Sequence, residues 1–108
     1  MTGYQLSFFM QQSRSHKGKA LHQWLLDLAQ SMQIRGATMI AAQEGLGSKH
    51  RVHSARFFEL ADQPIEITMV VSESECEAIL QALQAEPGLR LFYSKVPVQF
   101  GVIGEAED

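Results

Sequence analysis

The stretch PIEITMVVSESEC, residues 64–76, decides the fold because it contains the junction between an extended segment and a helix. The apolar run at residues 65–71 has the length and character of a strand. Ser72 and Glu75 then have the spacing of a capping box, in which the serine accepts a hydrogen bond from an early helical N–H and the glutamate reaches back. We therefore predict a strand that leads directly into a helix.

The segments on either side of this junction continue the same pattern. A Pro-Gly pair at 87–88 ends the helix, and residues 89–100 predict a final extended segment that bends near Pro97. Residues 55–60 are also extended, and the proline of residues 61–64 separates them from the next strand. The buried stripe of the helix consists of Cys76, Ile79, Leu80 and Leu83.

The N-terminal part of the chain also alternates between strand and helix. Residues 4–10 are apolar and aromatic and predict a strand, whereas the polar residues 11–18 predict a loop. Residues 19–33 predict a helix, which Gly36 can stop. The apolar stripe of this helix consists of Leu21, Trp24, Leu25, Leu28 and Met32.

Two short segments complete the order of elements. Residues 37–42 predict a strand, and residues 44–48 predict a turn because they hold two glycines. The resulting order is β-α-β-β-α-β, the ferredoxin-like α+β fold with two helices on one face of an antiparallel sheet. We expect a single domain at residues 1–101 and an acidic, loosely held tail at residues 102–108.

The second face of the predicted sheet also carries apolar side chains. Phe8 and Phe9 are adjacent in a strand, so their rings lie on opposite faces. A chain of 108 residues has a marginal core by itself. We therefore expect another copy of the chain to cover the face that the helices leave open.

Composition excludes several classes of function. The net charge of −3 shows no basic excess, so we do not expect nucleic-acid binding. Cys76 is the only cysteine, which fits a reducing compartment and a small core residue. The chain has no apolar run of bilayer length and no secretory signal at its start, so we expect a cytoplasmic protein.

Glycines and basic residues mark a candidate anion site. Gly45 and Gly47 can bring backbone N–H groups close to a phosphate, although a plain tight turn explains them equally well. The adjoining basic residues are Lys49, His50, Arg51, His53 and Arg56. A second basic group, Arg14, His16 and Lys19, precedes the first helix. Either group can contact an anion or a partner, or can simply be an ordinary charged loop.

Three motifs carry a resemblance to a known family. Residues 36–47, GATMIAAQEGLG, resemble the second strand and glycine-aromatic-glycine turn of PII signalling proteins. The elements HKGKAL at 16–21 and KHRVHSAR at 49–56, with the strand at 64–67, resemble still more closely an uncharacterised PII-like family of unknown function. Together these matches cover nearly the whole chain in the expected order.

This resemblance implies a homotrimer that binds an adenine nucleotide in clefts between subunits. The nucleotide-binding positions are then Thr38, Gly45, Leu46, Gly47, Arg56, Glu66, Gly88 and Arg90. The glycine-rich, lysine-containing loop that holds triphosphate in PII proteins is reduced here to Gly88 and Arg90. AMP, ADP or a cyclic nucleotide is therefore expected as the effector rather than ATP. The family resemblance also implies control of a partner protein, for which a membrane transporter is the candidate.

Two alternatives remain open from the sequence alone. The first is a trimeric metal-binding protein similar to copper- or zinc-tolerance proteins, for which His50 and His53 are the candidate ligands. We expect no dedicated metal site, because only one cysteine is present and nothing forces the histidines together. The second is an enzyme on the same fold, but no Ser-His-Asp set, paired carboxylates or cofactor motif is evident. We therefore predict a protein without catalytic residues or a cofactor.

Overall fold

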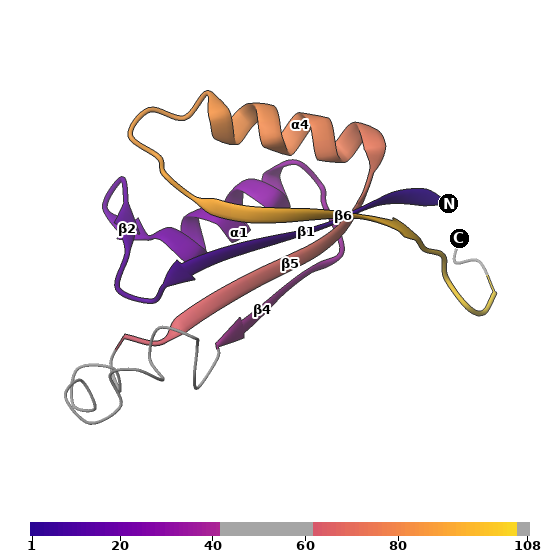
Figure 1. Cartoon of the computed structure of the whole chain (residues 1–108), viewed down its shortest axis with the longest axis horizontal. Helices are drawn as coiled ribbons and strands as arrows, with labels where there is room; N and C mark the ends of the chain where they lie inside the picture. Colours follow the sequence, from indigo (N-terminus) through magenta and orange to yellow (C-terminus); the bar gives the residue numbers. More distant parts are fainter. Residues whose placement is uncertain (42–61, 106–108) are drawn as a thin grey trace.

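The computed structural model describes residues 1–41 and 62–105 of the chain. Its elements are β1 (Thr2–Gln11), β2 (Ser15–His16), β3 (Lys19–Ala20), α1 (Leu21–Ser31), β4 (Ala37–Ala41), β5 (Pro64–Ser72), α4 (Glu73–Gln84) and β6 (Phe92–Gln99). Four antiparallel strands form the main sheet in the order β4-β5-β1-β6 (Figure 1). Non-consecutive strands are thus neighbours at the centre, as in the split βαβ arrangement. The predicted ferredoxin-like α+β fold is confirmed.

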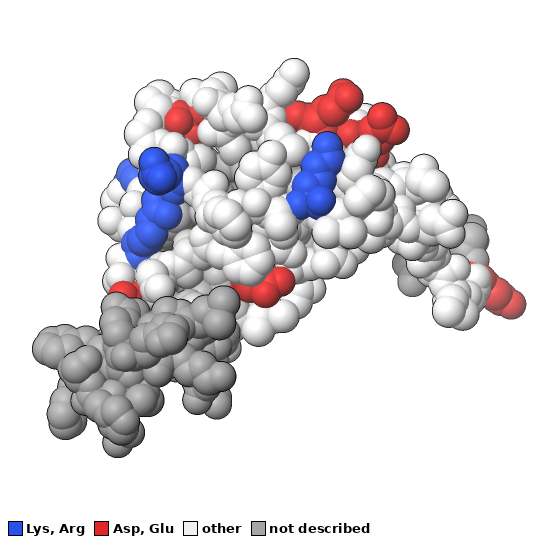
Figure 2. Space-filling model, in the orientation of Figure 1, with Lys and Arg blue, Asp and Glu red and all other residues white. Residues whose placement is uncertain are grey.

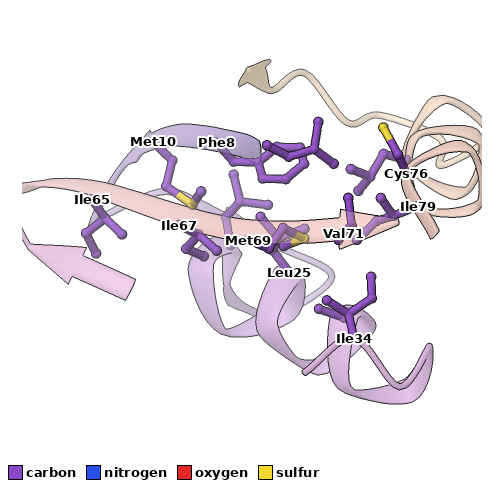
Figure 3. Close-up of a cluster of buried hydrophobic side chains, with 14 residues drawn as sticks. Phe8, Met10, Leu25, Ile34, Ile65, Ile67, Met69, Val71, Cys76 and Ile79 are labelled. Carbon is purple, nitrogen blue, oxygen red and sulfur yellow. The ribbon is translucent and has the colours of Figure 1, made fainter. Parts of the chain in front are cut away.

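Both helices pack against the same face of this sheet. In the register of β1 and β5, Leu6 lies opposite Met69 and Phe8 opposite Ile67. Residues paired in register point to one face, and these four are at most 1% exposed. Figure 3 shows the β5 side chains and those of both helices in one buried cluster. The helical members are Leu21, Leu25 and Ala29 of α1 and Cys76, Ile79 and Leu83 of α4.

The predicted capping box starts α4 where β5 ends. The Ser72 hydroxyl accepts a hydrogen bond from the Glu75 N–H at 3.2 Å, and the Ser72 N–H donates to Glu75 Oε1 at 2.8 Å. Both donors would otherwise lack a partner at the helix start. Cys76, one residue further on, is 2% exposed as expected for a core residue, and burial raises the pKa of its thiol.

The loop prediction for residues 11–18 is wrong in part. Residues 15–16 pair with residues 19–20 as the two-stranded hairpin β2–β3. Its central residues, Lys17 at φ 51° and Gly18 at φ 81°, are both left-handed, as a type I′ turn requires. The predicted helix start at residue 19 is also wrong. Residues 19–20 belong to the hairpin, so α1 begins at Leu21.

The end of α1 also differs from the prediction that Gly36 stops the helix. Gln33 has φ 62° and donates its N–H to the Gln30 carbonyl, while the Ile34 N–H donates to the Ala29 carbonyl. This pair of bonds is a Schellman motif with glutamine where glycine is usual, so the sequence signal was absent. Gly36 instead lies against β5, where an added Cβ would be 3.4 Å from the Val70 carbonyl oxygen.

The final strand is shorter than predicted. β6 starts at Phe92 rather than at residue 89, because Leu89 and Leu91 pack against the core before the strand begins. Pro97 lies within β6 opposite Tyr4. β6 is an edge strand, which tolerates a residue without a backbone donor. The predicted extended segment at 55–60 lies outside the described residues.

The face of the sheet opposite α1 and α4, which we call the helix-free face because neither of these two helices covers it, is partly apolar, as expected. Phe9 is 37% exposed there while its neighbour Phe8 is 1% exposed on the helix side, so the predicted division of the pair is confirmed. Phe92 lies opposite Phe9 on β6, and the two rings are 5.7 Å apart. Ile40 of β4 and Val96 of β6 add further exposed apolar surface to this face.

Ser72→Ala tests the capping box. We expect the substitution to lower the free energy of unfolding by about 1 kcal/mol, because an early helical N–H loses its acceptor. Ser74→Ala is the matched control, since Ser74 is exposed and makes no bond to a backbone N–H at the helix start. Urea unfolding of both variants measures the difference, and equal losses would contradict the assignment of the cap.

Candidate functional site

The sequence-predicted site residues fall into three groups in the structure. One group, consisting of Gly45, Leu46, Gly47, His50, Arg51, His53 and Arg56, lies outside the described residues. A second group, Thr38 and Glu66, lies on the helix-free face of the sheet. The third group, Arg14, His16, Lys19, Gly88 and Arg90, lies at the end of the sheet where β1 stops and β6 begins.

Thr38 and Glu66 lie on neighbouring strands beside a polar row. In register across the sheet, Thr38 of β4 lies opposite Thr68, Thr68 opposite Ser7, and Ser7 opposite Ser94. The Thr68 hydroxyl donates to Glu66 Oε2 at 2.6 Å, and it lies 3.1 Å from the Ser7 hydroxyl. The carboxylate of Glu66 is thus held on the helix-free face by a side-chain hydrogen bond.

The third group forms a second, separate cluster, which we name the basic corner. It consists of residues 14–17 of the hairpin and residues 86–90 of the α4–β6 loop. His16 Nε2 lies 2.7 Å and Lys17 Nζ 2.9 Å from the same oxygen, Oε2 of Glu86. Arg14 Nη2 donates to the Arg90 carbonyl at 2.6 Å. Two segments that are about 70 residues apart in sequence are therefore tied together by side-chain contacts.

Local structure explains how the corner is held. The Leu89 N–H donates to the Glu86 carbonyl at 3.4 Å across a turn with Pro87 in its second position and Gly88 at φ 75° in its third. This is the pattern of a type II turn, which requires a residue tolerant of positive φ. On the hairpin side, the His16 ring packs edge-on against Trp24, with 4.6 Å between ring centroids.

The carboxylate of Glu86 is the electrostatic centre of the corner. Hydrogen bonds from His16 and then from Lys17 hold the pKa of Glu86 below its usual range. An ionised carboxylate only accepts hydrogen bonds, so His16 Nε2 carries the proton that it shares with Glu86. Arg14, Lys17 and Arg90 add three permanent positive charges, so the corner remains basic overall. Figure 2 shows Lys and Arg gathered at the β2 end of the molecule and Asp and Glu over the start of α4.

Lys19 belongs to a different contact from the rest of its predicted group. Its Nζ lies 2.9 Å from Asp27 Oδ2, and Gln23 donates to the other oxygen of the same carboxylate. The hydrogen bond from Lys19 is the larger cause of the lowered pKa of Asp27. The ammonium of Lys19 is therefore directed along α1, away from Glu86.

An apolar cavity of about 150 Å³ adjoins the corner through Leu89. It lies between α4, β1 and the start of β6 on the helix side of the sheet. Its lining residues are Phe8, Leu80, Leu83, Gln84, Leu89, Leu91 and Tyr93. The corner thus combines cationic donors with a neighbouring apolar surface.

The two described parts of the predicted site lie at opposite edges of the sheet within one copy of the chain. Thr38 lies on the β4 edge, whereas Arg90 lies in the loop that leads into β6, the opposite edge. Three strand spacings separate these edges, which amounts to about 14 Å. The corner also belongs to the helix layer, since His16 packs on Trp24 of α1, whereas Thr38 lies on the other face.

Sequence reasoning did not single out Lys17 and Glu86 as individual site residues. The Lys-Gly pair at 17–18 was the available signal for the hairpin, but type I′ turns usually show Asn-Gly or Asp-Gly. The pairing of His16 with Glu86 depends on a contact across 70 positions, for which the sequence has no local pattern. Only the folded positions of the side chains show that Lys17 and Glu86 belong to the corner.

The described part of the chain has neither a cluster of metal ligands nor a helix suited to cross a membrane. Residues 1–41 and 62–105 contain no group of three His, Cys, Asp or Glu side chains placed to hold a metal ion. The candidate metal ligands His50 and His53 lie outside these residues. Neither α1 nor α4 has the length and apolar character needed to cross a bilayer.

Comparison with known proteins identifies the family. Residues 3–93 match the model of DUF190, described as uncharacterized ACR, COG1993. A UPF0166 protein of Aquifex aeolicus (strain VF5) is 23% identical over 82 residues, which cover 75% of this chain and 78% of that protein. The chain belongs to the DUF190 family, and the sequence-based recognition of an uncharacterised PII-like family is confirmed.

Two solved structures share the fold. A PII-like signalling protein from Thermus thermophilus aligns with TM-score 0.59 and 18% identity, over 90% of this chain and 86% of that one. The structure of CPII bound to ADP, AMP and acetate, from Thiomonas intermedia K12, aligns with TM-score 0.53 and 19% identity, over 92% and 90% of the two chains. The fold is therefore that of PII-like proteins.

The lowered pKa of Glu86 predicts a pH-dependent contribution to stability. Because the folded pKa lies below the unfolded value of about 4.3, the ionised carboxylate stabilises the fold above that pH. This contribution is lost as pH falls through the folded pKa. We expect wild type to be more stable than Glu86→Gln at pH 7 and the difference to shrink as pH falls below the unfolded pKa of the carboxyl, about 4.3.

Unfolding of both proteins by urea at several pH values measures this difference. His16→Ala should raise the Glu86 pKa toward its usual value, which the titration of the carboxyl carbon by NMR detects directly. A wild-type advantage that persists unchanged at pH 3 would contradict the role of the ionised carboxylate.

Proposed function

We propose that this protein is a trimeric PII-like regulator that binds an adenine nucleotide between subunits and thereby controls a partner protein. The observation that carries the proposal is the separation of the predicted site into two parts on opposite edges and faces of one sheet. One copy does not bring these two parts side by side, which favours a site that two neighbouring copies share. The β4 part of one subunit then faces the basic corner of the next.

The helix-free face supports self-association. Phe9, Phe92, Ile40 and Val96 expose between 37% and 71% of their surface on or beside this face, which neither α1 nor α4 covers. Covering this apolar surface by another copy is favourable by roughly 25 cal/mol for each Å² removed from water. Assembly of three copies is what the family resemblance implies, and residues 1–101 are the unit that assembles.

The chemistry of the basic corner supports a phosphate-bearing ligand. Arg14, Lys17 and Arg90 supply cations, and the adjoining apolar cavity offers a surface for a purine ring. The solved CPII structure holds ADP and AMP on the same fold. The predicted positions Thr38, Gly45, Leu46, Gly47, Arg56 and Glu66 complete the site from the neighbouring subunit. We expect AMP, ADP or a cyclic nucleotide to bind more tightly than ATP.

The proposed role is regulation without catalysis. The described residues show one salt-bridged carboxylate and its cations at the corner, but no nucleophile with an adjacent general base. A protein that only binds a nucleotide can still act as a sensor, because binding changes the surface that it offers to a partner. A membrane transporter, contacted from the cytoplasm, is the candidate partner.

Binding calorimetry with AMP, ADP, ATP and cyclic AMP tests the ligand. Arg90→Ala should weaken binding by about tenfold to a hundredfold, because a charge-assisted hydrogen bond to phosphate contributes about 1.5–3 kcal/mol. Arg35→Ala is the matched control, since Arg35 is an exposed arginine beside β4 at the other end of the sheet. Absence of binding to all four nucleotides at millimolar concentration would exclude the proposal.

Mixing two variants tests the location of the site. Arg56→Ala damages one part of each cleft and Arg90→Ala damages the other, so each pure variant binds poorly. Subunit exchange in an equal mixture should restore about one quarter of the sites, because each part is intact with a chance of about one half. A site contained within one chain predicts no recovery after exchange, which sedimentation and calorimetry together would reveal.

A further inference from the structure

The basic corner already holds an anion, namely the carboxylate of Glu86. We propose that His16 and Lys17 form the binding site for a phosphate oxygen, and that Glu86 is a built-in competitor which this phosphate displaces. This inference rests on the proposed function, since it assigns the phosphate subsite and its regulation. His16 and Lys17 are the donors that bind the phosphate, and their contacts with Glu86 must break first.

The geometry of the donors is that of an anion site. His16 Nε2 and Lys17 Nζ come from consecutive residues and converge on one oxygen at 2.7 and 2.9 Å. These distances are typical of charge-assisted bonds to carboxylate or phosphate oxygens. A phosphate oxygen placed where Glu86 Oε2 now lies would accept both bonds without any movement of the donors.

One of the two donors, the His16 ring, is held in place by packing as well as by its contact with Glu86. His16 is packed against Trp24, and its side chain is only 10% exposed. The hairpin is closed by a bond from the Leu21 N–H to the Arg14 carbonyl at 2.8 Å. Glu86 lies beyond the end of α4 in a turn closed by a long 3.4 Å bond, and its side chain is 15% exposed. Exchange therefore requires Glu86 to leave the corner while the His16 ring keeps its position.

Charge favours the exchange. Glu86 offers one negative charge to the corner, whereas a terminal phosphate offers nearly two. Lys17 is 62% exposed at its side chain, so an incoming anion can approach it from solvent. Arg14 and Arg90 lie in the same corner, with the Arg14 guanidinium held on the Arg90 carbonyl, and add attraction for a multiply charged group.

The exchange couples the ligand to the start of β6. Glu86 and Leu89 close the turn that leads to this strand, and Leu89 lines the apolar cavity. When phosphate takes the two donors, Glu86 no longer ties this turn to the hairpin. Ligand binding thus breaks two of the three side-chain contacts described between hairpin and loop, while the bond from Arg14 to the Arg90 carbonyl remains.

Titration with inorganic pyrophosphate and with AMP tests the competition. Glu86→Gln removes the charge of the competitor with little change of shape, so affinity for both probes should rise by about fivefold, as expected for loss of an exposed ion pair. Asp27→Asn is the matched control, because it also frees a lysine from a carboxylate at 2.9 Å and changes net charge equally. We expect this control to change affinity by less than about twofold.

Two further measurements test the subsite even if Glu86→Gln does not fold. In wild type, pyrophosphate should shift the NMR signals of the His16 ring and of the Glu86 carboxyl carbon together, with one dissociation constant. Lys17→Ala should weaken pyrophosphate binding by about fivefold to tenfold. Signals of His16 that do not respond to pyrophosphate would overturn the assignment of this subsite.

The outcomes separate this inference from the proposed function. Tighter binding of both probes to Glu86→Gln supports both the competition by Glu86 and the nucleotide-binding function. Binding of AMP that is unchanged or weaker in Glu86→Gln overturns the competition but leaves the proposed regulatory function standing. Tighter pyrophosphate binding with no AMP binding to either protein supports the anion site and excludes the nucleotide-binding function.

Discussion

The antiparallel pairing of β1 with β5 places Leu6 opposite Met69 and Phe8 opposite Ile67, and the rest of the structure depends on this register. These side chains are fully buried, so a shift of one residue would move them to the helix-free face at a cost of several kcal/mol. The same register puts Phe9, Ser7 and Thr68 on the opposite face. The pairing therefore builds the core and, at the same time, the surface through which copies of the chain are proposed to meet.

Much of the fold follows from periodicity and from one capping box. The apolar run in β5, the box at Ser72 and Glu75 and the stripe of α1 are local signals, and the structure has a strand or helix at each, although α1 begins at Leu21 rather than at residue 19. Two features were not predictable because their usual residues are replaced. A lysine takes the first left-handed position of the hairpin turn, and Gln33 takes the position where glycine normally ends a helix.

The candidate site was predictable as a set of segments but not as a set of contacts. The sequence indicated basic residues before α1 and a glycine-containing loop before β6, and the structure brings these two together in the basic corner. It does not bring them near Thr38, which lies across the sheet on the other face. Strand order decides this separation, and strand order depends on long-range pairing that no local pattern encodes. The division of the predicted site is the reason why we propose an assembly in which neighbouring copies share a ligand.

We propose that the nucleotide lies between subunits, and a crystal structure of the protein grown with AMP would show its position. We expect a trimer in which AMP contacts the basic corner of one subunit, with its phosphate on His16 and Lys17, and the β4 side of the next. AMP bound wholly within one chain, or to a face remote from the basic corner, would contradict it.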